Sequence, residues 1–109
     1  MSERAVFLVG FGGPESLDEV PPFVESVLGR VPPEHVTEHA VERYRLIGGG
    51  SPLPATTRRQ AQLVAEELGR RGVDAGVYVG RLHADPTIRS AAYRMVADGV
   101  EDVTVVSLA

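Results

Sequence analysis

The stretch Ala5-Val6-Phe7-Leu8-Val9-Gly10-Phe11, followed by Gly12-Gly13-Pro14, decides the fold class. An unbroken apolar run without polar alternation is typical of a strand that is covered on both faces, as in a parallel sheet. The glycine-proline sequence after it predicts a tight turn into a helix that Gly29 ends. Ser16 is expected to cap this helix, although Pro21-Pro22 favours a later start.

Helices and strands alternate along the rest of the sequence. We expect helices at residues 33–47, 57–71 and 87–98, and strands at 73–79 and 103–106. The resulting order β-α-α-α-β-α-β predicts an α/β fold in which right-handed crossovers join parallel strands. A sheet of three strands is small for such a fold. Residues 1–109 are therefore expected to form the N-terminal part of a doubly wound domain, truncated after the third strand.

The ends and faces of these elements can also be predicted. Thr56 or Thr57 is expected to cap the third helix, and Gly80 is expected to end the second strand. In the last helix, which Pro86 and Thr87 open, the apolar spacing predicts an inner face. Its members are Ile88, Ala91, Ala92, Met95 and Val96.

The composition excludes several kinds of site. The net charge of −4 disfavours binding to nucleic acid or to an anionic membrane surface. Because cysteine is absent, the chain can form neither disulfides nor thiolate metal sites. All 11 basic residues are arginine, so no lysine is present to bind phosphate or to form a Schiff base. Neither a membrane-spanning stretch nor a targeting segment is visible, and we therefore expect a cytoplasmic protein.

Two segments are expected at the sheet edge where ligands bind, which lies beyond the carboxyl ends of parallel strands. The first is the turn after Gly10, and the second is the segment 81–86, which carries His83. The turn does not match the dinucleotide-binding pattern, because Glu15 occupies the place of the third glycine. A flavodoxin-like nucleotide binder is therefore kept only as an alternative. Phe11 would offer an aromatic face to a ligand or pack in the core, and His83 would act in a site or bond within its loop.

The sequence Gly48-Gly49-Gly50-Ser51-Pro52-Leu53 has neither a helical nor a strand period and predicts a loop. Consecutive glycines permit a sharp reversal or a close approach of a ligand to the backbone. Arg43 and Tyr44 precede this loop by about one helical turn. A guanidinium, an aromatic ring and accessible backbone suit a planar anionic ligand. The alternative is a plain connection between helices, with a solvated Arg43.

The segment His35-Val36-Thr37-Glu38-His39 has the H-x-x-E-H spacing of inverted zinc peptidases. Two histidines four residues apart share one helix face and can both reach a zinc ion. The rest of a peptidase site is not evident. An exposed polar face explains Glu34, Glu38 and Glu42 without a metal, so no metal site is predicted.

Several segments resemble, in the same order, the N-terminal part of the ferrochelatase family. The most specific is Arg43-Tyr44-Arg45-Leu46-Ile47-Gly48-Gly49-Gly50-Ser51-Pro52-Leu53, and Phe11-Gly12-Gly13-Pro14-Glu15-Ser16 is moderately specific. The resemblance continues through Tyr78-Val79-Gly80-Arg81 and His83 to the last strand, and so covers nearly the whole chain. It implies a chelatase-like and flavodoxin-like half of a protein whose macrocycle cleft lies between two similar halves.

The resemblance implies a lyase that inserts ferrous iron into a porphyrin in haem biosynthesis. The residues expected to contact the macrocycle or its propionates are Phe11, Arg43, Tyr44 and Ser51. Further positions expected to line the cleft are Gly12, Gly13, Pro14, Gly50 and His83. Iron and porphyrin are substrates, and neither a permanently bound cofactor nor a metal site is expected. The family's metal-inserting histidine and its acidic partner match nothing up to residue 109, so this chain by itself is expected to hold no catalytic residue and to be inactive.

Two alternatives to a portion of a ferrochelatase stay open. A short chelatase-like chain could dimerise to rebuild the two-lobed cleft. The chain could also be a non-enzymatic porphyrin-binding module. The expected partner is a porphyrin in each case, without nucleic acid or a membrane span, and self-association or pairing with a C-terminal part is expected in addition.

Overall fold

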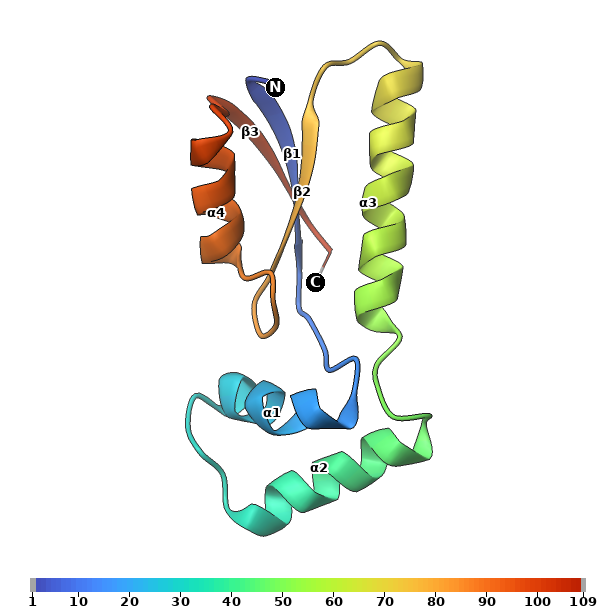
Figure 1. Cartoon of the computed structure of the whole chain (residues 1–109), viewed down its shortest axis with the longest axis vertical. Coiled ribbons are helices and arrows are strands. Elements are labelled where there is room, and N and C mark those ends of the chain that lie inside the picture. The colour runs from blue at the N-terminus through green and yellow to red at the C-terminus, as the bar shows by residue number, and fades with distance from the viewer. Residues whose placement is uncertain (1, 109) are drawn as a thin grey trace.

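The computed structural model describes residues 2–108, in which a three-stranded sheet has helices on both faces and at one end (Figure 1). The strands are β1 (Arg4–Gly10), β2 (Gly76–Arg81) and β3 (Asp102–Ser107). Both pairings are parallel, and the order β2-β1-β3 places β1 in the centre. The predicted α/β class, the parallel sheet and the order of the elements are confirmed.

The helices of the described region form three groups around this sheet. They are α1 (Val20–Leu28), α2 (Glu34–Leu46), α3 (Leu53–Arg70) and α4 (Ile88–Ala97). α3 and α4 pack against β2 from opposite faces, whereas α1 and α2 pack on each other across the end where β1 and β2 finish (Figure 1). The carboxyl edge of the sheet therefore faces α1.

β1 is buried on both faces, as its apolar sequence predicts. The face toward α4 carries the core cluster Ala5, Phe7, Ala91 and Met95. Leu8, which is 2% exposed, points to the opposite face, where the side chain of Thr57 from α3 lies against Gly10. β3, in contrast, is exposed along its whole length. Burial of apolar side chains therefore centres on β1.

The first helix begins later than its expected cap. The Ser16 side chain makes no capping hydrogen bond, and a 3₁₀ turn at Leu17–Glu19 separates it from α1. Pro21 and Pro22 stand in the first turn of α1, where a backbone amide has no helical acceptor and its absence costs little. The prediction of a Ser16 cap was wrong, whereas the later start that the prolines favour is confirmed.

α3 begins at Leu53, about one turn before the predicted threonine cap. Pro52 is the cap residue, and a further proline lies in the first turn, so that fixed φ angles start the helix early. Thr56 and Thr57 lie inside the helix. Their hydroxyls donate 3.1 Å hydrogen bonds to the carbonyls of Pro52 and Leu53, one turn earlier. The predicted cap was therefore wrong.

β2 begins and ends later than the predicted 73–79, and Gly80 lies inside the strand. Parallel pairing with β1 sets this register and places Gly80 opposite Val9. A Cβ atom at Gly80 would lie 2.7 Å from the Phe7 ring and 2.9 Å from the Cα of Ile88. Close packing of α4 on the sheet, and not termination of a strand, explains this glycine.

α4 begins directly after Pro86 and Thr87, the residues predicted to open it, and the Thr87 hydroxyl caps it by accepting a 3.1 Å hydrogen bond from the Ser90 amide. Three of the expected inner residues pack on the core: Ile88, Ala91 and Met95. Ala92 is exposed and Val96 is 75% exposed, so their assignment to the inner face was wrong. The helix packs on β2 at the edge of the sheet, and a single strand covers a narrower stripe than the sequence predicts.

Tyr78 joins β2 to the end of α4, because its hydroxyl donates a 2.6 Å hydrogen bond to Asp98 Oδ2. This bond, followed by desolvation, raises the pKa of Tyr78 above its ordinary value of about 10. The protonated phenol therefore contributes stability that is complete below the unfolded pKa and is lost as the pH rises through the higher folded pKa. In an alkaline titration followed by phenolate absorbance, we expect Tyr78 to ionise above the ordinary range of tyrosine.

A single substitution tests this assignment. Tyr78→Phe is expected to remove the part of the phenolate titration that lies above the ordinary tyrosine range. A Tyr78→Phe chain that keeps this part of the titration would contradict the assignment.

Candidate functional site

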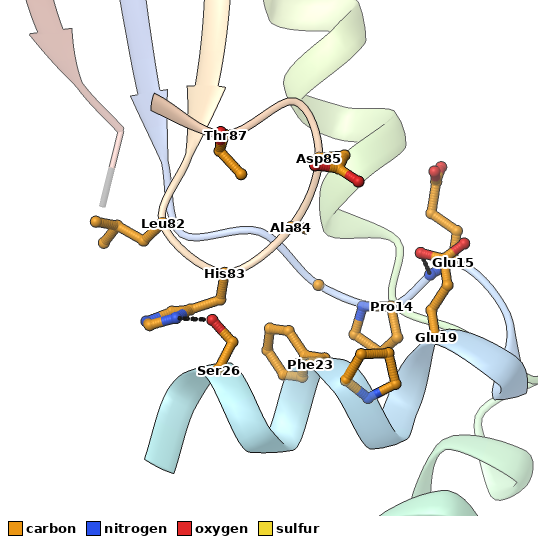
Figure 2. A pocket seen from close by; sticks show the side chains of 12 residues that line it. Pro14, Glu15, Glu19, Phe23, Ser26, Leu82, His83, Ala84, Asp85 and Thr87 are labelled. Carbon is orange, nitrogen blue, oxygen red and sulfur yellow. Dashed lines mark hydrogen bonds between the residues drawn. The ribbon is translucent and has the colours of Figure 1, made fainter. Parts of the chain in front are cut away.

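A cavity of about 560 Å³ lies between α1 and the segment that connects β2 to α4 (Figure 2). The strand-end turn contributes Gly13 and Pro14, and α1 contributes Phe23 and Ser26. The connecting segment, residues 82–87, forms the wall opposite α1. Turns from the carboxyl ends of two neighbouring parallel strands therefore meet at this cavity, as expected for a ligand site of an open α/β sheet.

Backbone hydrogen bonds hold the two strand-end segments side by side. The Leu82 amide donates to Gly10 O and the His83 amide donates to Phe11 O, both at 3.1 Å. Gly12 has a φ of 96°, and a Cβ atom there would lie 3.0 Å from the Cβ of Ala84. This left-handed backbone and close approach require glycine. Packing therefore accounts for Gly12 without a bound phosphate.

The glycine-rich loop packs on the same turn. The Ser51 amide donates a 2.6 Å hydrogen bond to Pro14 O. A Cβ atom at Gly13 would lie 3.0 Å from Ser51 Oγ, and one at Gly50 would overlap the carbonyl oxygen of Glu15. Position 50 is therefore a close contact between backbones. Ser51 is bonded to the turn that follows Phe11, so these two predicted residues belong to one structural unit.

Phe23 is the centre of a group of four rings. Its centroid lies 6.1 Å from that of Phe11, 6.4 Å from His83 and 6.5 Å from Tyr44, with the rings nearly perpendicular. The rings of Phe11 and His83 lie 4.8 Å apart. Edge-to-face contacts of this kind stabilise aromatic groups beyond the area that they bury. Three residues predicted from separate segments thus come together around Phe23.

The imidazole of His83 is held against α1. Its Nδ1 shares a 2.9 Å hydrogen bond with Ser26 Oγ (Figure 2). His83 therefore bonds to a helix and not within its own loop. The sequence analysis missed Phe23 and Ser26 as site residues. The spacing of Phe23 from its neighbours fits the apolar stripe of a helix, and no local pattern shows that α1 crosses the strand ends.

Arg43 and Tyr44 line a second hollow, of about 420 Å³, on α2. The contact between Tyr44 and Phe23 links this hollow to the larger cavity. Among residues 2–108, no carboxylate lies within ion-pair distance of Arg43, whereas its neighbour Arg45 pairs with Glu42 at 3.5 Å. The Arg43 guanidinium is therefore available to an external anion.

Some of the predicted site residues line a hollow, and the others support it from behind. Gly13, Pro14 and His83 line the larger cavity, and Arg43 and Tyr44 line the smaller one. The remainder support these walls by packing or hydrogen bonding: Phe11, Gly12, Gly50 and Ser51. Their contacts with a porphyrin stay predictions.

Carboxylates border one side of the larger cavity. They belong to Glu15, Glu19 and Asp85 (Figure 2). Glu15 accepts a 2.6 Å hydrogen bond from Arg58, and this bond holds the pKa of Glu15 below its usual value. Glu15 is thus ionised at neutral pH and its charge is balanced by Arg58, whereas Glu19 and Asp85 form no ion pair among residues 2–108.

The zinc-peptidase spacing does not assemble into a site in residues 2–108. His35 and His39 are exposed on α2, and no three acidic, histidine or cysteine side chains of this region are grouped to hold a metal ion. In the same residues, no helix combines the length and apolar character needed to cross a bilayer.

The fold defines an α/β protein of the doubly wound type, with a cavity at the carboxyl edge of its sheet as the candidate ligand site. The sequence profile of the ferrochelatase family matches residues 3–109, and the chain belongs to that family. The predicted resemblance is confirmed.

Three relatives show the extent of the match. The ferrochelatase of Deinococcus radiodurans is 37% identical over 105 residues, covering 95% of this chain and 33% of the relative. The coproporphyrin III ferrochelatase of Corynebacterium diphtheriae is 39% identical over 102 residues, covering 93% and 28%. The ferrochelatase of Parasynechococcus marenigrum is 34% identical over 125 residues, covering 99% and 32%. The chain spans about a third of the length of these curated relatives.

Proposed function

We propose that this chain supplies porphyrin contacts within a ferrochelatase, and that the complete protein inserts ferrous iron into a porphyrin in haem biosynthesis. The observation that carries the proposal is the ring group around Phe23, which brings Phe11, Tyr44 and His83 together beside a cavity at the sheet edge. Aromatic faces suit a flat apolar macrocycle. The reaction rests on membership of the ferrochelatase family.

The distribution of charge favours one orientation of the macrocycle. Glu19 and Asp85 border the larger cavity without a cation partner among residues 2–108 and disfavour propionates there, whereas Arg43, which has no carboxylate partner in the same residues, attracts them to the smaller hollow. We therefore orient the propionates toward α2. The apolar edge then lies near Phe11, which is 39% exposed.

Iron and porphyrin enter this proposal as substrates. Insertion requires a base that removes the protons of the pyrrole nitrogens. We propose no such base within this chain, and we expect it in the remainder of the protein. The cytoplasmic location, the lack of a resident cofactor and the association with a second copy or a C-terminal part stay predictions.

Arg43→Gln is expected to weaken porphyrin binding by the 109-residue chain by about ten- to a hundredfold, because one hydrogen bond to an ionised group contributes about 1.5–3 kcal/mol. The measurement is a titration of coproporphyrin and of protoporphyrin, followed by the shift of the Soret band. Arg45→Gln is the matched control, since Arg45 lies on the same helix and already pairs with Glu42.

The possible outcomes distinguish the hypotheses about what the site binds and how. Equal affinities of the two variants would contradict the orientation toward Arg43. A wild-type chain that binds FMN but no porphyrin would contradict the proposed function and favour the nucleotide-binding alternative. Tighter binding of one porphyrin than the other would identify the preferred substrate.

A further inference from the structure

Arg81, the last residue of β2, is a buried cation without an acidic partner in the described part of the chain. Its side chain belongs to a residue that is only 5% exposed, and no carboxylate of residues 2–108 lies within ion-pair distance. The Nη1 atom donates a 2.6 Å hydrogen bond to Asp85 O, and Nη2 donates one of 3.3 Å to Pro54 O. Nε has no hydrogen-bond partner in the described region. Burying an incompletely bonded charge costs free energy. The carbonyl groups that Arg81 binds indicate what this cost achieves.

The two acceptors belong to different segments, which both pack on the strand-end turn. Asp85 lies in the segment 82–87, which carries His83 into the larger cavity. Pro54 lies in the first turn of α3, directly after the glycine-rich loop. The Arg81 amide also donates to Pro86 O at 2.8 Å, which closes the segment around the arginine side chain. One guanidinium therefore links the segment 82–87 to the start of α3.

We propose that Arg81 is a positioning residue of the porphyrin site, which sets the place of His83 relative to Ser51 and the glycine-rich loop. This inference rests on the proposed function. Arg81 lines neither the larger cavity nor the smaller hollow, so that it acts through the backbone carbonyls that it binds.

The chemistry of the side chain fits this role. A guanidinium is a planar fork whose donors reach acceptors in different directions, whereas a lysine ammonium is a compact point charge. Desolvation lowers the pKa of Arg81, and the nearby Arg58 adds to this, while the charges of Glu15 and Glu19 oppose it. Arginine stays protonated at neutral pH under such conditions and keeps both bonds.

Arg81→Met tests the proposal, because methionine fills part of the same space without a donor. The dissociation constant for coproporphyrin is expected to rise about tenfold or more, since small displacements of a binding group have large effects. Arg89→Met is the matched control. Arg89 is exposed on the first turn of α4 and lines neither hollow, and its loss is expected to change the constant less than about twofold.

A second readout reports the position of His83 without porphyrin. The His83 ring lies 4.8 Å from that of Phe11, so that its protons are shifted by the ring current of Phe11. In nuclear magnetic resonance spectra, Arg81→Met is expected to remove much of this shift. The amides of β1 are expected to keep their protection from hydrogen exchange. Arg81→Lys is expected to be intermediate, because it can reach only one of the two carbonyls.

The outcomes keep the two proposals distinct. Unchanged porphyrin affinity and unchanged His83 resonances in Arg81→Met would overturn the positioning role. If that variant does not fold, a folded Arg81→Lys chain that matches the wild type in both readouts would overturn it, and one impaired in both would support it. If the wild-type chain binds no porphyrin, the proposed function fails, and the His83 resonances of the variants still decide whether Arg81 positions His83.

Discussion

Replacement of Gly50 by alanine is expected to lower the free energy of unfolding by about 3 kcal/mol. The new Cβ atom would overlap the carbonyl oxygen of Glu15 and lie 2.7 Å from its carbonyl carbon. Both are backbone atoms that cannot rotate away. The loop must therefore leave the strand-end turn and lose the hydrogen bond from the Ser51 amide to Pro14 O. Denaturant unfolding of the 109-residue chain measures the loss as a shift of the midpoint.

Gly69→Ala provides the matched control for Gly50→Ala. Gly69 lies inside α3, and a Cβ atom there meets nothing within 4 Å. Alanine is a better helix former than glycine, so this variant is expected to be more stable than the wild type by about 0.5–1 kcal/mol. Equal stability of the Gly50→Ala chain and the wild type would mean that the loop does not rest on Glu15.

Phe23→Ala is expected to impair both stability and porphyrin binding. Phe23 contacts the rings of Phe11, Tyr44 and His83, and each such pair contributes about 0.5–1.5 kcal/mol beyond the buried area. Because Phe23 is only partly buried, we expect a loss of about 2–3 kcal/mol, less than for a fully buried phenylalanine. The porphyrin dissociation constant is expected to rise more than tenfold, since the ring group loses its centre. Unfolding and Soret titrations of the same preparation measure the two effects.

Two further variants distinguish the effect of the aromatic ring of Phe23 from the effect of its side-chain volume. Phe23→Leu keeps much of the apolar volume and is expected to recover most of the stability, but less of the porphyrin affinity. Tyr93→Ala removes an aromatic side chain that is 69% exposed, and is expected to leave both quantities nearly unchanged. If Phe23→Ala had no larger effect than Tyr93→Ala, the ring group would not organise the site.

The candidate site is held together by contacts between the segments that carry its lining residues. The strand-end turn is bonded to the β2–α4 segment by the Leu82 and His83 amides and to the glycine-rich loop by the Ser51 amide. The Arg81 side chain adds hydrogen bonds to the β2–α4 segment and to the first turn of α3, which follows the glycine-rich loop. Rigid support of this kind places groups that contact a ligand more precisely than flexible loops do.

Local signals were sufficient for the order of the elements and for some of their ends. The apolar run of β1 and the left-handed Gly29 at the end of α1 were predicted because each depends on neighbouring residues. Pro86 and Thr87 were predicted to open α4 for the same reason. The caps at Ser16 and Thr56 or Thr57 were wrong because local signals competed there. The nearby prolines, with fixed φ angles, decided where those helices begin.

The sequence by itself determined the α/β class and the edge of the sheet at which a ligand site would lie. It showed family membership only as a resemblance of motifs. It could mark Gly50 as unusual, but it could not name its partner. The carbonyl of Glu15 meets Gly50 only after α1 and α2 have folded across the strand ends.

Tertiary structure alone decided that Phe23, Ser26 and Arg81 belong to the site. Their partners are distant in the chain: His83 for the first two, and Pro54 for the arginine. A helical period shows that one face of α1 is apolar, but the direction in which that face points depends on how the helix packs against the sheet. Packing between distant segments is therefore the physical reason that these residues could not be found from spacing.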